Sequence, residues 1–339
     1  MTIETRRSPS MREVAQAAQV SAQTVSRVLS DHPHVQPDTR ARVLAAANKL
    51  GYRRNNTARA LVTGRSNTLG VVTLATSFYS RASLALGIEH EARRSGYTVN
   101  TSTTASLASP AIGASISRLV DQGVDGLVIA VPLIDVDEPL EQLTRRVPTV
   151  VVDGSRTSAA DVVAVDQAIA ARLATEHLLN LGHRTVWHLA GPSEWSDSAT
   201  RVIGWKQALE DAGRDVPPEL HGDWTPEAGY RNGLLLGRMP EVTAVLVASD
   251  EMAFGLIRAL TELGRRVPED VSVVGIDDIA LAAYSNPPLT TVRQSFEETG
   301  RRAVAHLLRQ ISDPERDSAP ELVQPELIVR ATTCAPTST

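Results

Sequence analysis

The chain has 339 residues with 42% hydrophobic and 22% charged side chains, which is ordinary for a globular protein of two or three domains. Its single cysteine, Cys334, excludes an internal disulfide framework, and no apolar stretch reaches the roughly 18 residues that a membrane span needs. Residues 1–10 contain no apolar run typical of a secretory signal, so we expect a cytoplasmic protein.

The net charge of −5 conceals an asymmetry along the chain. Residues 1–66 contain eleven Lys or Arg and four acidic residues, a net charge of +7, and the rest of the chain carries −12. A basic segment on an acidic body is typical of proteins in which that segment alone meets a polyanion. Because the segment also has strong helical patterning, it favours nucleic acid as its partner over the alternative of a solvated tail.

The first two predicted helices lie close together near the start of the chain. Ser10 and Glu13 are spaced as a capping box, and apolar residues follow at helical intervals. After a short break, Ser21 is suited to cap a second helix, whose inner face carries Val25 and Val28.

A third helix is predicted between Pro37, which suits a first helical turn, and Gly51, which suits a helix end. Its expected inner stripe consists of Val43, Leu44, Ala47 and Leu50. Two short helices joined by a tight turn, with a third closing the core, form a helix-turn-helix domain. We therefore expect a DNA-binding domain over residues 1–52.

The exposed face of the second predicted helix carries side chains that can read DNA. Gln23 can pair with adenine and Arg27 with guanine in the major groove. Ser21, Thr24 and Ser26 can donate to phosphates, which positions a helix without reading sequence. Taken alone, the same pattern is equally typical of a solvated polar helix face.

The stretch 14–29, VAQAAQVSAQTVSRVL, resembles the headpiece signature of the lactose-repressor (LacI/GalR) family, V-A-x-x-A-G-V-S-x-x-T-V-S-R-V-L. The resemblance implies that Ala22, Gln23 and Arg27 occupy the base-reading positions, where Ala22 suits contact with a thymine methyl group. Gln19 stands in place of the turn glycine. If the turn needs a positive φ, this replacement costs on the order of 1 kcal/mol.

Residues 53–66 match the family's hinge, which by resemblance becomes helical on operator DNA and wedges a leucine pair into the minor groove. Asn55, Ala58 and Leu61 are the expected DNA contacts of this segment, with Leu61 as the wedging leucine. Arg54 stands where family members often have proline. A plain linker is the alternative interpretation.

From residue 67 onward, β-rich runs alternate with helical patterns, which predicts parallel sheets covered by helices on both faces. The expected strands are 69–74, 98–101, 126–131, 149–153, 185–189, 244–248 and 271–276. The expected helices include 82–95, 112–122, 168–181, 201–212, 252–263 and 296–311.

The predicted fold is therefore α/β, an all-α headpiece followed by a two-lobed, periplasmic-binding-protein-like domain over residues 67–339. The first lobe is expected to comprise about 67–162 and 294–324. The second is expected to comprise about 163–293 and 325–339.

Polar residues follow several predicted strands, at the sheet edge where open α/β folds bind ligands. Asp153 and Asp277 end strands, Arg201 is expected to start a helix, and Trp224 lies in a Gly-Asp-Trp segment. Carboxylates, an arginine and an aromatic ring form a typical sugar site. Asp250 also follows a strand, but it is interpreted as the cap of the next helix.

The family resemblance extends over this body through segments such as 222–224 (GDW) and 273–278 (VVGIDD). It implies effector contacts at Asp153, Arg201, Trp224, Ser249, Asp277, Gln294 and Phe296, and Phe78 is expected to add an apolar wall. Ser249 and Ala130 stand where the family's namesake has asparagine. The identity of the effector therefore does not transfer.

The resemblance implies a sequence-specific transcriptional repressor, a homodimer on double-stranded operator DNA, with a mono- or disaccharide as inducer. No cofactor, metal or membrane partner is expected. The alternative is a co-repressor type that responds to a nucleobase or nucleoside. An enzyme is disfavoured because the chain has no G-x-S-x-G, phosphate-loop or metal-spaced motif, and an exported sugar-binding protein has no use for the basic segment.

Overall fold

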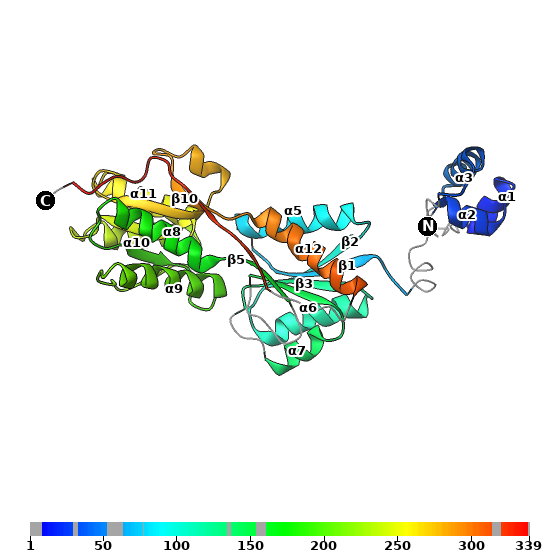
Figure 1. Ribbon diagram of the computed structural model, residues 1–339, viewed down its shortest axis with the longest axis horizontal. Helices are drawn as coiled ribbons and strands as arrows, with labels where there is room; N and C mark the ends of the chain where they lie inside the picture. Colours follow the sequence, from blue (N-terminus) through cyan, green and yellow to red (C-terminus); the bar gives the residue numbers. More distant parts are fainter. Residues whose placement is uncertain are drawn as a thin grey trace, which may run out of the picture. The chain divides into compact units, whose positions relative to one another are not determined.

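A computed structural model describes residues 9–29, 33–52, 64–76, 78–133, 137–153, 161–313 and 320–337. The chain divides into two compact units, Met1–Ser66 and Asn67–Thr339, which are described separately (Figure 1). In the described part of the chain, no helix is both long and apolar enough to cross a membrane.

The first unit, the headpiece, contains three helices, α1 (Met11–Ala17), α2 (Ala22–Leu29) and α3 (Pro37–Leu50). The predicted capping box at the start of α1 is confirmed, because Ser10 and Glu13 satisfy each other's backbone N–H groups. The turn between α1 and α2 places Gln19 at a φ of 54°, the left-handed conformation that the glycine of the family signature suits. Gly51 ends α3 at a φ of 65°.

The headpiece core forms where all three helices meet, and the predicted inner stripe of α3 is partly wrong. Val43 and Ala47 are buried as expected, but Leu44 and Leu50 are 45% and 38% exposed, and Ala46 is buried instead. Positions i, i+3 and i+4 share a helix face, so Val43, Ala46 and Ala47 turn inward together while Leu44 points outward. Leu50 is the last residue of the helix.

The second unit contains two six-stranded sheets, each at the centre of one lobe. In the first lobe, called the N-lobe, the strand order is β11-β5-β4-β3-β1-β2, and every pairing is parallel. Its strands are β1 (Thr68–Leu74), β2 (Thr98–Thr104), β3 (Gly126–Ala130), β4 (Thr149–Val152), β5 (Asp161–Val165) and β11 (Glu321–Val323). Its helices are α5 (Tyr79–Arg94), α6 (Ser109–Asp121), α7 (Glu138–Thr144) and α12 (Phe296–Ser312).

Helices cover both faces of the N-lobe sheet. Neighbouring residues of a strand point to opposite faces, so each strand has apolar side chains on both faces for helices to bury. Val71 of β1 packs with Leu84 of α5 and Leu307 of α12 on one face. The next residue, Val72, packs with Ile112 of α6 on the other. Figure 1 shows α5 and α12 side by side along this sheet.

The second lobe, called the C-lobe, repeats this plan with the strand order β12-β10-β9-β8-β6-β7, in which only β12 runs antiparallel to its neighbour. Its strands are β6 (Trp187–Ala190), β7 (Leu220–His221), β8 (Ala244–Val247), β9 (Ser272–Asp277), β10 (Thr290–Arg293) and β12 (Glu326–Ile328). Its helices are α8 (Gln167–Asn180), α9 (Ser196–Asp211), α10 (Pro226–Leu236), α11 (Asp250–Glu262) and the 3₁₀ helix η1 (Ala280–Ala283). Helices α10 and α11 pack on one face, and α8 and α9 on the other.

The chain passes between the lobes three times, from β5 to α8, from β10 to α12 and from β11 to β12. The first passage lies after Val165, so the expected lobe boundary at 162 falls inside β5. Two rigid lobes that are joined by three such segments can hinge about the cleft between them.

The predicted fold class is confirmed, and each of the seven expected strands is present. Strands β5, β7, β10, β11 and β12 were not expected. Arg201 was expected to start a helix, but it lies inside α9, which begins five residues earlier. The first turns of α9 are Ser- and Thr-rich, so the apolar periodicity that marks a helix in sequence begins only later.

Candidate functional site

The carboxyl ends of strands from both lobes meet at a small space of about 30 Å³. From the N-lobe it is lined by Phe78, Ser80, Arg81 and Phe296, and from the C-lobe by Trp195, Asp197, Arg201, Trp224, Ser249, Glu251 and Asp277. We call this space and the residues around it the cleft. Six of the eight residues that the sequence suggested for an effector site line it, and the other two, Asp153 and Gln294, contact lining residues.

Three cleft residues hold an unusual backbone conformation. Asp153, Trp224 and Asp277 have φ values of 55°, 70° and 127°, in the region that side chains other than glycine rarely adopt. Each such residue costs on the order of 1–3 kcal/mol, and strain of this kind collects at binding sites.

Arg201 is fixed by contacts on several sides. It donates from Nε to Oε1 of Gln167 at 2.8 Å and from Nη1 to the carbonyl oxygen of Ala248. Its guanidinium carbon lies 5.4 Å from the ring centroid of Trp224, a cation–π arrangement. With 3% of its surface exposed, Arg201 is thus held in one orientation before any ligand binds.

A hydrogen-bonded chain continues from Arg201 across the lobe connection. Gln167 donates to Oε1 of Gln294 at 2.7 Å, and Gln294 donates to Oδ1 of Asp277 at 2.7 Å. Gln294 lies in the segment between β10 and α12, where the chain crosses between lobes. The binding groups of the cleft are therefore coupled to a hinge segment.

Three aromatic rings form one wall of the cleft. Phe78 meets Trp195 edge-on at a centroid distance of 6.4 Å, and Trp195 lies 5.4 Å from Trp224. Rings of this size offer flat apolar surface to a ligand. Trp195 was not among the residues that the sequence suggested, because it lies in the loop between β6 and α9, five residues after the strand ends.

Arg81 is the second arginine of the cleft, and sequence reasoning missed it. Its Nη2 lies 3.3 Å from Asp197 of the C-lobe, and its Nη1 lies 4.0 Å from Asp153 of the N-lobe. The guanidinium carbon is 5.6 Å from the Trp195 ring. Nε of Arg81 is buried and has no partner among the described residues. Arg81 thus forms an ion pair between the two lobes.

Burial raises the pKa values of the aspartate side chains in the cleft. Burial, followed by the charge of Asp197, raises the pKa of Asp153 to about 7. Burial also raises the pKa of Asp197, although Arg81 and Arg201 oppose this, and it raises the pKa of Asp277 well above its ordinary value. Desolvation on this scale is typical of functional sites, where a ligand completes the polar contacts.

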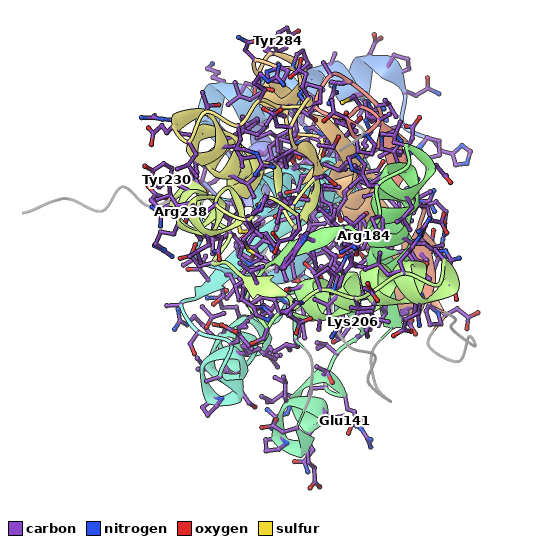
Figure 2. All side chains as sticks on the ribbon, turned by 90° about the vertical axis from the view of Figure 1, so that its left-hand side faces the viewer. Glu141, Arg184, Lys206, Tyr230, Arg238 and Tyr284 are labelled. Carbon is purple, nitrogen blue, oxygen red and sulfur yellow. The ribbon has the colours of Figure 1, made fainter. Side chains whose placement is uncertain are left out.

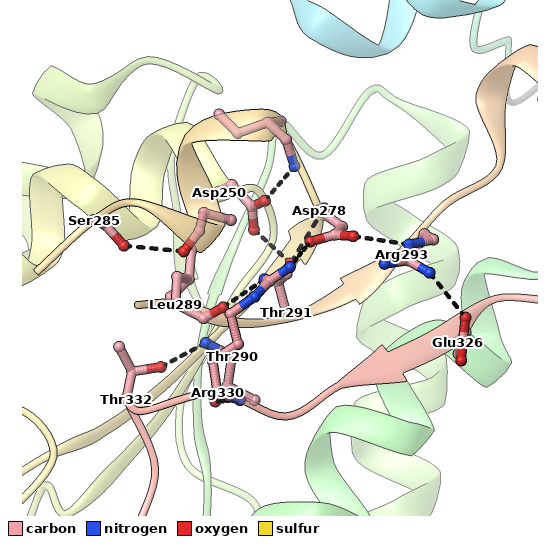
Figure 3. A network of polar contacts seen from close by, with 12 residues as sticks. Asp250, Asp278, Ser285, Leu289, Thr290, Thr291, Arg293, Glu326, Arg330 and Thr332 are labelled. Carbon is pink, nitrogen blue, oxygen red and sulfur yellow. Dashed lines mark hydrogen bonds and ion pairs between the residues drawn. The ribbon is translucent and has the colours of Figure 1, made fainter. Parts of the chain in front are cut away.

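The interpretation of Asp250 as a helix cap is wrong. Ser249 is the N-cap of α11, since its Oγ accepts from the backbone N–H of Met252 at 3.2 Å. Asp250 instead points beneath the end of β9, where it accepts from Thr291 Oγ1 and, at 2.9 Å, from the backbone N–H of Ile279 (Figure 3). Burial raises its pKa to about 7. Asp250 therefore ties down the segment that carries Asp277.

Asp278 anchors the same segment from the outside. It pairs with Arg293 at 2.8 Å and with Arg330 at 2.6 Å (Figure 3). These contacts join β9, β10 and the segment after β12. Among the described residues, no group of three His, Cys, Asp or Glu side chains is placed to hold a metal ion.

In the headpiece, α2 has two distinct faces. Val25 and Val28 are buried, whereas Ala22, Gln23 and Arg27 are exposed. Thr24 and Ser26 are half-buried at the border between the faces, and Ser21 caps the helix by accepting from the backbone N–H of Thr24 at 3.1 Å. The suggested hinge contacts Asn55, Ala58 and Leu61 lie outside the described residues.

Comparisons with known proteins agree with this architecture. Residues 10–55 match the family described as bacterial regulatory proteins, lacI family, and residues 175–333 match the periplasmic binding protein-like domain. The chain is 35% identical to the lactose operon repressor of Escherichia coli over 96% of this chain and 90% of that protein. It is 31% identical to the repressor PurR of Vibrio vulnificus over 95% and 98% of the respective lengths.

Solved structures give the same result. The lac repressor dimer bound to operator and the anti-inducer ONPF superposes with a TM-score of 0.88, at 33% identity, over 97% of this chain and all of that chain. The complex of the regulator CelR with cellobiose has a TM-score of 0.69 at 31% identity, over 96% and 99% of the chains. The chain belongs to the LacI family of bacterial transcription regulators. It is a DNA-binding regulator and not an enzyme, so the cleft acids are not catalytic residues.

Proposed function

We propose that this regulator represses transcription at an operator and that a small sugar, bound in the cleft as an inducer, lowers its affinity for that operator. The observation that carries the proposal is Arg201, which is buried, fixed by Gln167 and stacked over Trp224 at the meeting point of the lobes. A guanidinium beside an aromatic ring suits a pyranose, whose hydroxyls accept from arginine while its apolar face stacks on the ring.

The acids of the cleft complement this arrangement. Carboxylates accept hydrogen bonds from sugar hydroxyls, and Asp153 and Asp277 approach the cleft from opposite lobes. Ser249, Gln294, Phe78 and Phe296 complete the proposed effector site. Relatives support a sugar, since one is a lactose operon repressor and another is a regulator complexed with cellobiose.

Sugar binding requires the cleft to change shape. A space of about 30 Å³ holds about one water molecule, whereas small-molecule pockets span roughly 300–1,000 Å³. The lobes must separate, or the side chains between them must move, before a sugar fits. Because a ligand shifts an equilibrium only by its preference for one state, this change supplies the coupling between cleft and DNA.

On the DNA side, we propose that α2 enters the major groove, where Ala22, Gln23 and Arg27 read bases. Ser21, Thr24 and Ser26 then contact phosphates. The proposal also assigns residues 1–52 to the DNA-binding domain and 53–66 to a hinge, in which Asn55, Ala58 and Leu61 contact DNA. The exposed position of Gln23 and Arg27 opposite the buried valines supports this docking.

A homodimer fits this use of DNA, because two headpieces read a two-fold-related operator. Leu281 and Tyr284, on and beside η1, are 65% and 86% exposed, and Figure 2 shows Tyr284 at the outer surface. Exposed apolar side chains of this size favour a protein partner. The solved lac repressor dimer on operator DNA supports the same assignment. A cytoplasmic location stays a prediction.

The second candidate is a regulator of the co-repressor type, whose affinity for operator DNA rises when a nucleobase binds. The Trp224 ring can stack on a purine as well as on a sugar, and PurR repressors are among the relatives. The two candidates differ in the sign of the ligand effect on DNA affinity, so one assay separates them.

The test is a gel-shift titration of the full chain on the DNA upstream of its own gene, in the presence of neutral sugars or purine bases. Release by a sugar supports the proposed function. Tighter binding to this DNA in the presence of hypoxanthine or guanine, without release of the DNA by any sugar, would favour the co-repressor alternative instead.

A further inference from the structure

The two lobes meet in the cleft through an ion pair between Arg81 of α5 and Asp197 of α9. The pair is buried, with 5% and 11% of the two side chains exposed, at a separation of 3.3 Å. Asp153 lies on the other side of the same guanidinium, 4.0 Å away. Arg81 is therefore enclosed by one carboxylate from each lobe.

Neither arginine of the cleft has a free pair of parallel N–H groups with which to bind an anion. Binding of a phosphate or carboxylate normally uses two parallel N–H groups of one arginine. Both Nη groups of Arg81 face Asp153 and Asp197, and Arg201 uses its Nε and Nη1 on Gln167 and the carbonyl of Ala248. An anionic ligand would have to displace one of these acceptors.

The charges around the cleft also oppose an anion. Four acids, Asp153, Asp197, Glu251 and Asp277, stand against two arginines. Burial, and after it the charge of Asp197, raises the pKa of Asp153 to about 7, so a nearby anion would further disfavour the charged form of this carboxyl. A ligand phosphate would add a further negative charge close to Asp197.

What the cleft does offer is a pair of unused donors. Nε of Arg81 and Nε1 of Trp224 are buried without a hydrogen-bond partner among the described residues. Both can only donate, and the hydroxyl and ether oxygens of an uncharged sugar are suitable acceptors. Resting on the sugar function proposed above, we propose that the cleft admits uncharged sugars and rejects their phosphorylated forms, and that Asp197 enforces this choice by occupying Arg81 from the opposite lobe.

The experiment compares cellobiose, maltose and lactose with their 6′-phosphates on the full chain. Binding is measured by calorimetry and by the fluorescence of the tryptophans, two of which, Trp195 and Trp224, line the cleft. For each pair, the measured quantity is the ratio of the phosphate's Kd to that of the neutral sugar. The wild-type protein is expected to give a ratio of about ten or more for any sugar that it binds.

Three variants test the role of Asp197. Asp197→Asn keeps the size but frees Arg81 for a phosphate, so the ratio falls by about fivefold or more. Arg81→Met removes the cation that pairs with Asp197 across the lobes, so the ratio stays the same or rises. Glu210→Gln removes an exposed charge from the same helix, α9, and leaves the ratio unchanged. Thermal unfolding of each variant verifies that it folds.

The outcomes separate the two proposals. A phosphorylated sugar that binds the wild type as tightly as its neutral form overturns the charge selection and leaves the sugar function intact. An unchanged ratio in Asp197→Asn, or a fall in Arg81→Met, overturns the role of Asp197. If neither these six sugars nor any neutral sugar of the gel-shift titration binds at millimolar concentration, both the sugar function and this inference are wrong.

Discussion

The outer edge of the Trp224 ring lies against Gly191, so that a Cβ atom at residue 191 would overlap the ring. Gly191 directly follows β6, and Trp224 follows β7 with a φ of 70°. The bare glycine backbone and the strained tryptophan backbone together place the indole beneath the Arg201 guanidinium. The main stacking surface of the cleft therefore depends on a residue with no side chain.

Gly191→Ala is expected to weaken sugar binding by about tenfold, because overpacking costs roughly 1–3 kcal/mol and here pushes the ring toward the cleft. Calorimetry on the full chain measures the change. The control is Gly113→Ala in α6, where an added Cβ meets only the end of a leucine side chain at 3.3 Å. Equal sugar affinity in Gly191→Ala and wild type would show that Trp224 does not contact the sugar.

Arg27→Ala is expected to relax base preference and to cost about 1–3 kcal/mol on the best operator, because a bidentate contact to guanine is lost. Binding to a set of single-base operator variants measures this. Ser26→Ala, at the edge of the same helix face, should instead weaken all sequences by similar factors. Unchanged specificity in Arg27→Ala means that α2 does not dock as proposed.

Gln19→Gly is expected to stabilise the headpiece by about 1 kcal/mol, because glycine adopts the observed φ of 54° without strain. Hydrogen exchange of α1 and α2 in the full chain reports the local stability. Gln16→Gly is the matched control, since residue 16 lies inside α1 and glycine there destabilises by about 1 kcal/mol. Destabilisation by both substitutions argues that the turn does not strain Gln19.

Asp250→Asn is expected to change how stability depends on pH. Since burial raises the pKa of Asp250 from 3.8 to about 7, the folded protein binds this proton more tightly than the unfolded chain. Its contribution is fully present below pH 3.8 and is lost as the pH rises through about 7. The stability of the variant relative to wild type should therefore increase from pH 5 to pH 8, by on the order of a few kcal/mol.

Denaturant unfolding at several pH values measures this difference. The histidines with lowered pKa, His177, His183 and His188, act in the opposite direction but are present in both proteins, so they cancel. Asp270→Asn is the control, because Arg266 lowers the pKa of Asp270 and confines its effect to acidic pH. A constant difference between Asp250→Asn and wild type would mean that Asp250 is not a buried acid.

The headpiece shows what local sequence determines. The capping box of Ser10 depends on neighbouring residues and was predicted, and the left-handed conformation of Gln19 is the one for which the family's turn glycine is suited. The exposure of Leu44 depends on which side of α3 the other two helices cover, which is a long-range property. The apolar periodicity of the sequence predicted α3 but not which of its apolar residues are buried.

The cleft shows the same division. Asp153, Ser249 and Asp277 were predictable because parallel strands end at a common edge. Arg81, Asp197 and Gln167 lie on helices, so no local pattern marks them. Arg81 and Asp197 meet only because one lobe packs against the other, and Gln167 reaches the cleft through the packing of α8 on α9. Asp250 was misinterpreted because an acidic residue at a helix start resembles a cap, while Ser249 already fills that position.

The coupling between cleft and DNA is tested most directly by the operator affinity of the full chain with and without a sugar that calorimetry shows to bind. We expect a saturating sugar to raise the Kd for operator DNA by about tenfold or more in the wild type. Arg201→Lys loses the planar contacts to Gln167 and Trp224, so it should bind DNA normally but show no shift at the same sugar concentration. A bound sugar that leaves the wild-type Kd unchanged would contradict the account.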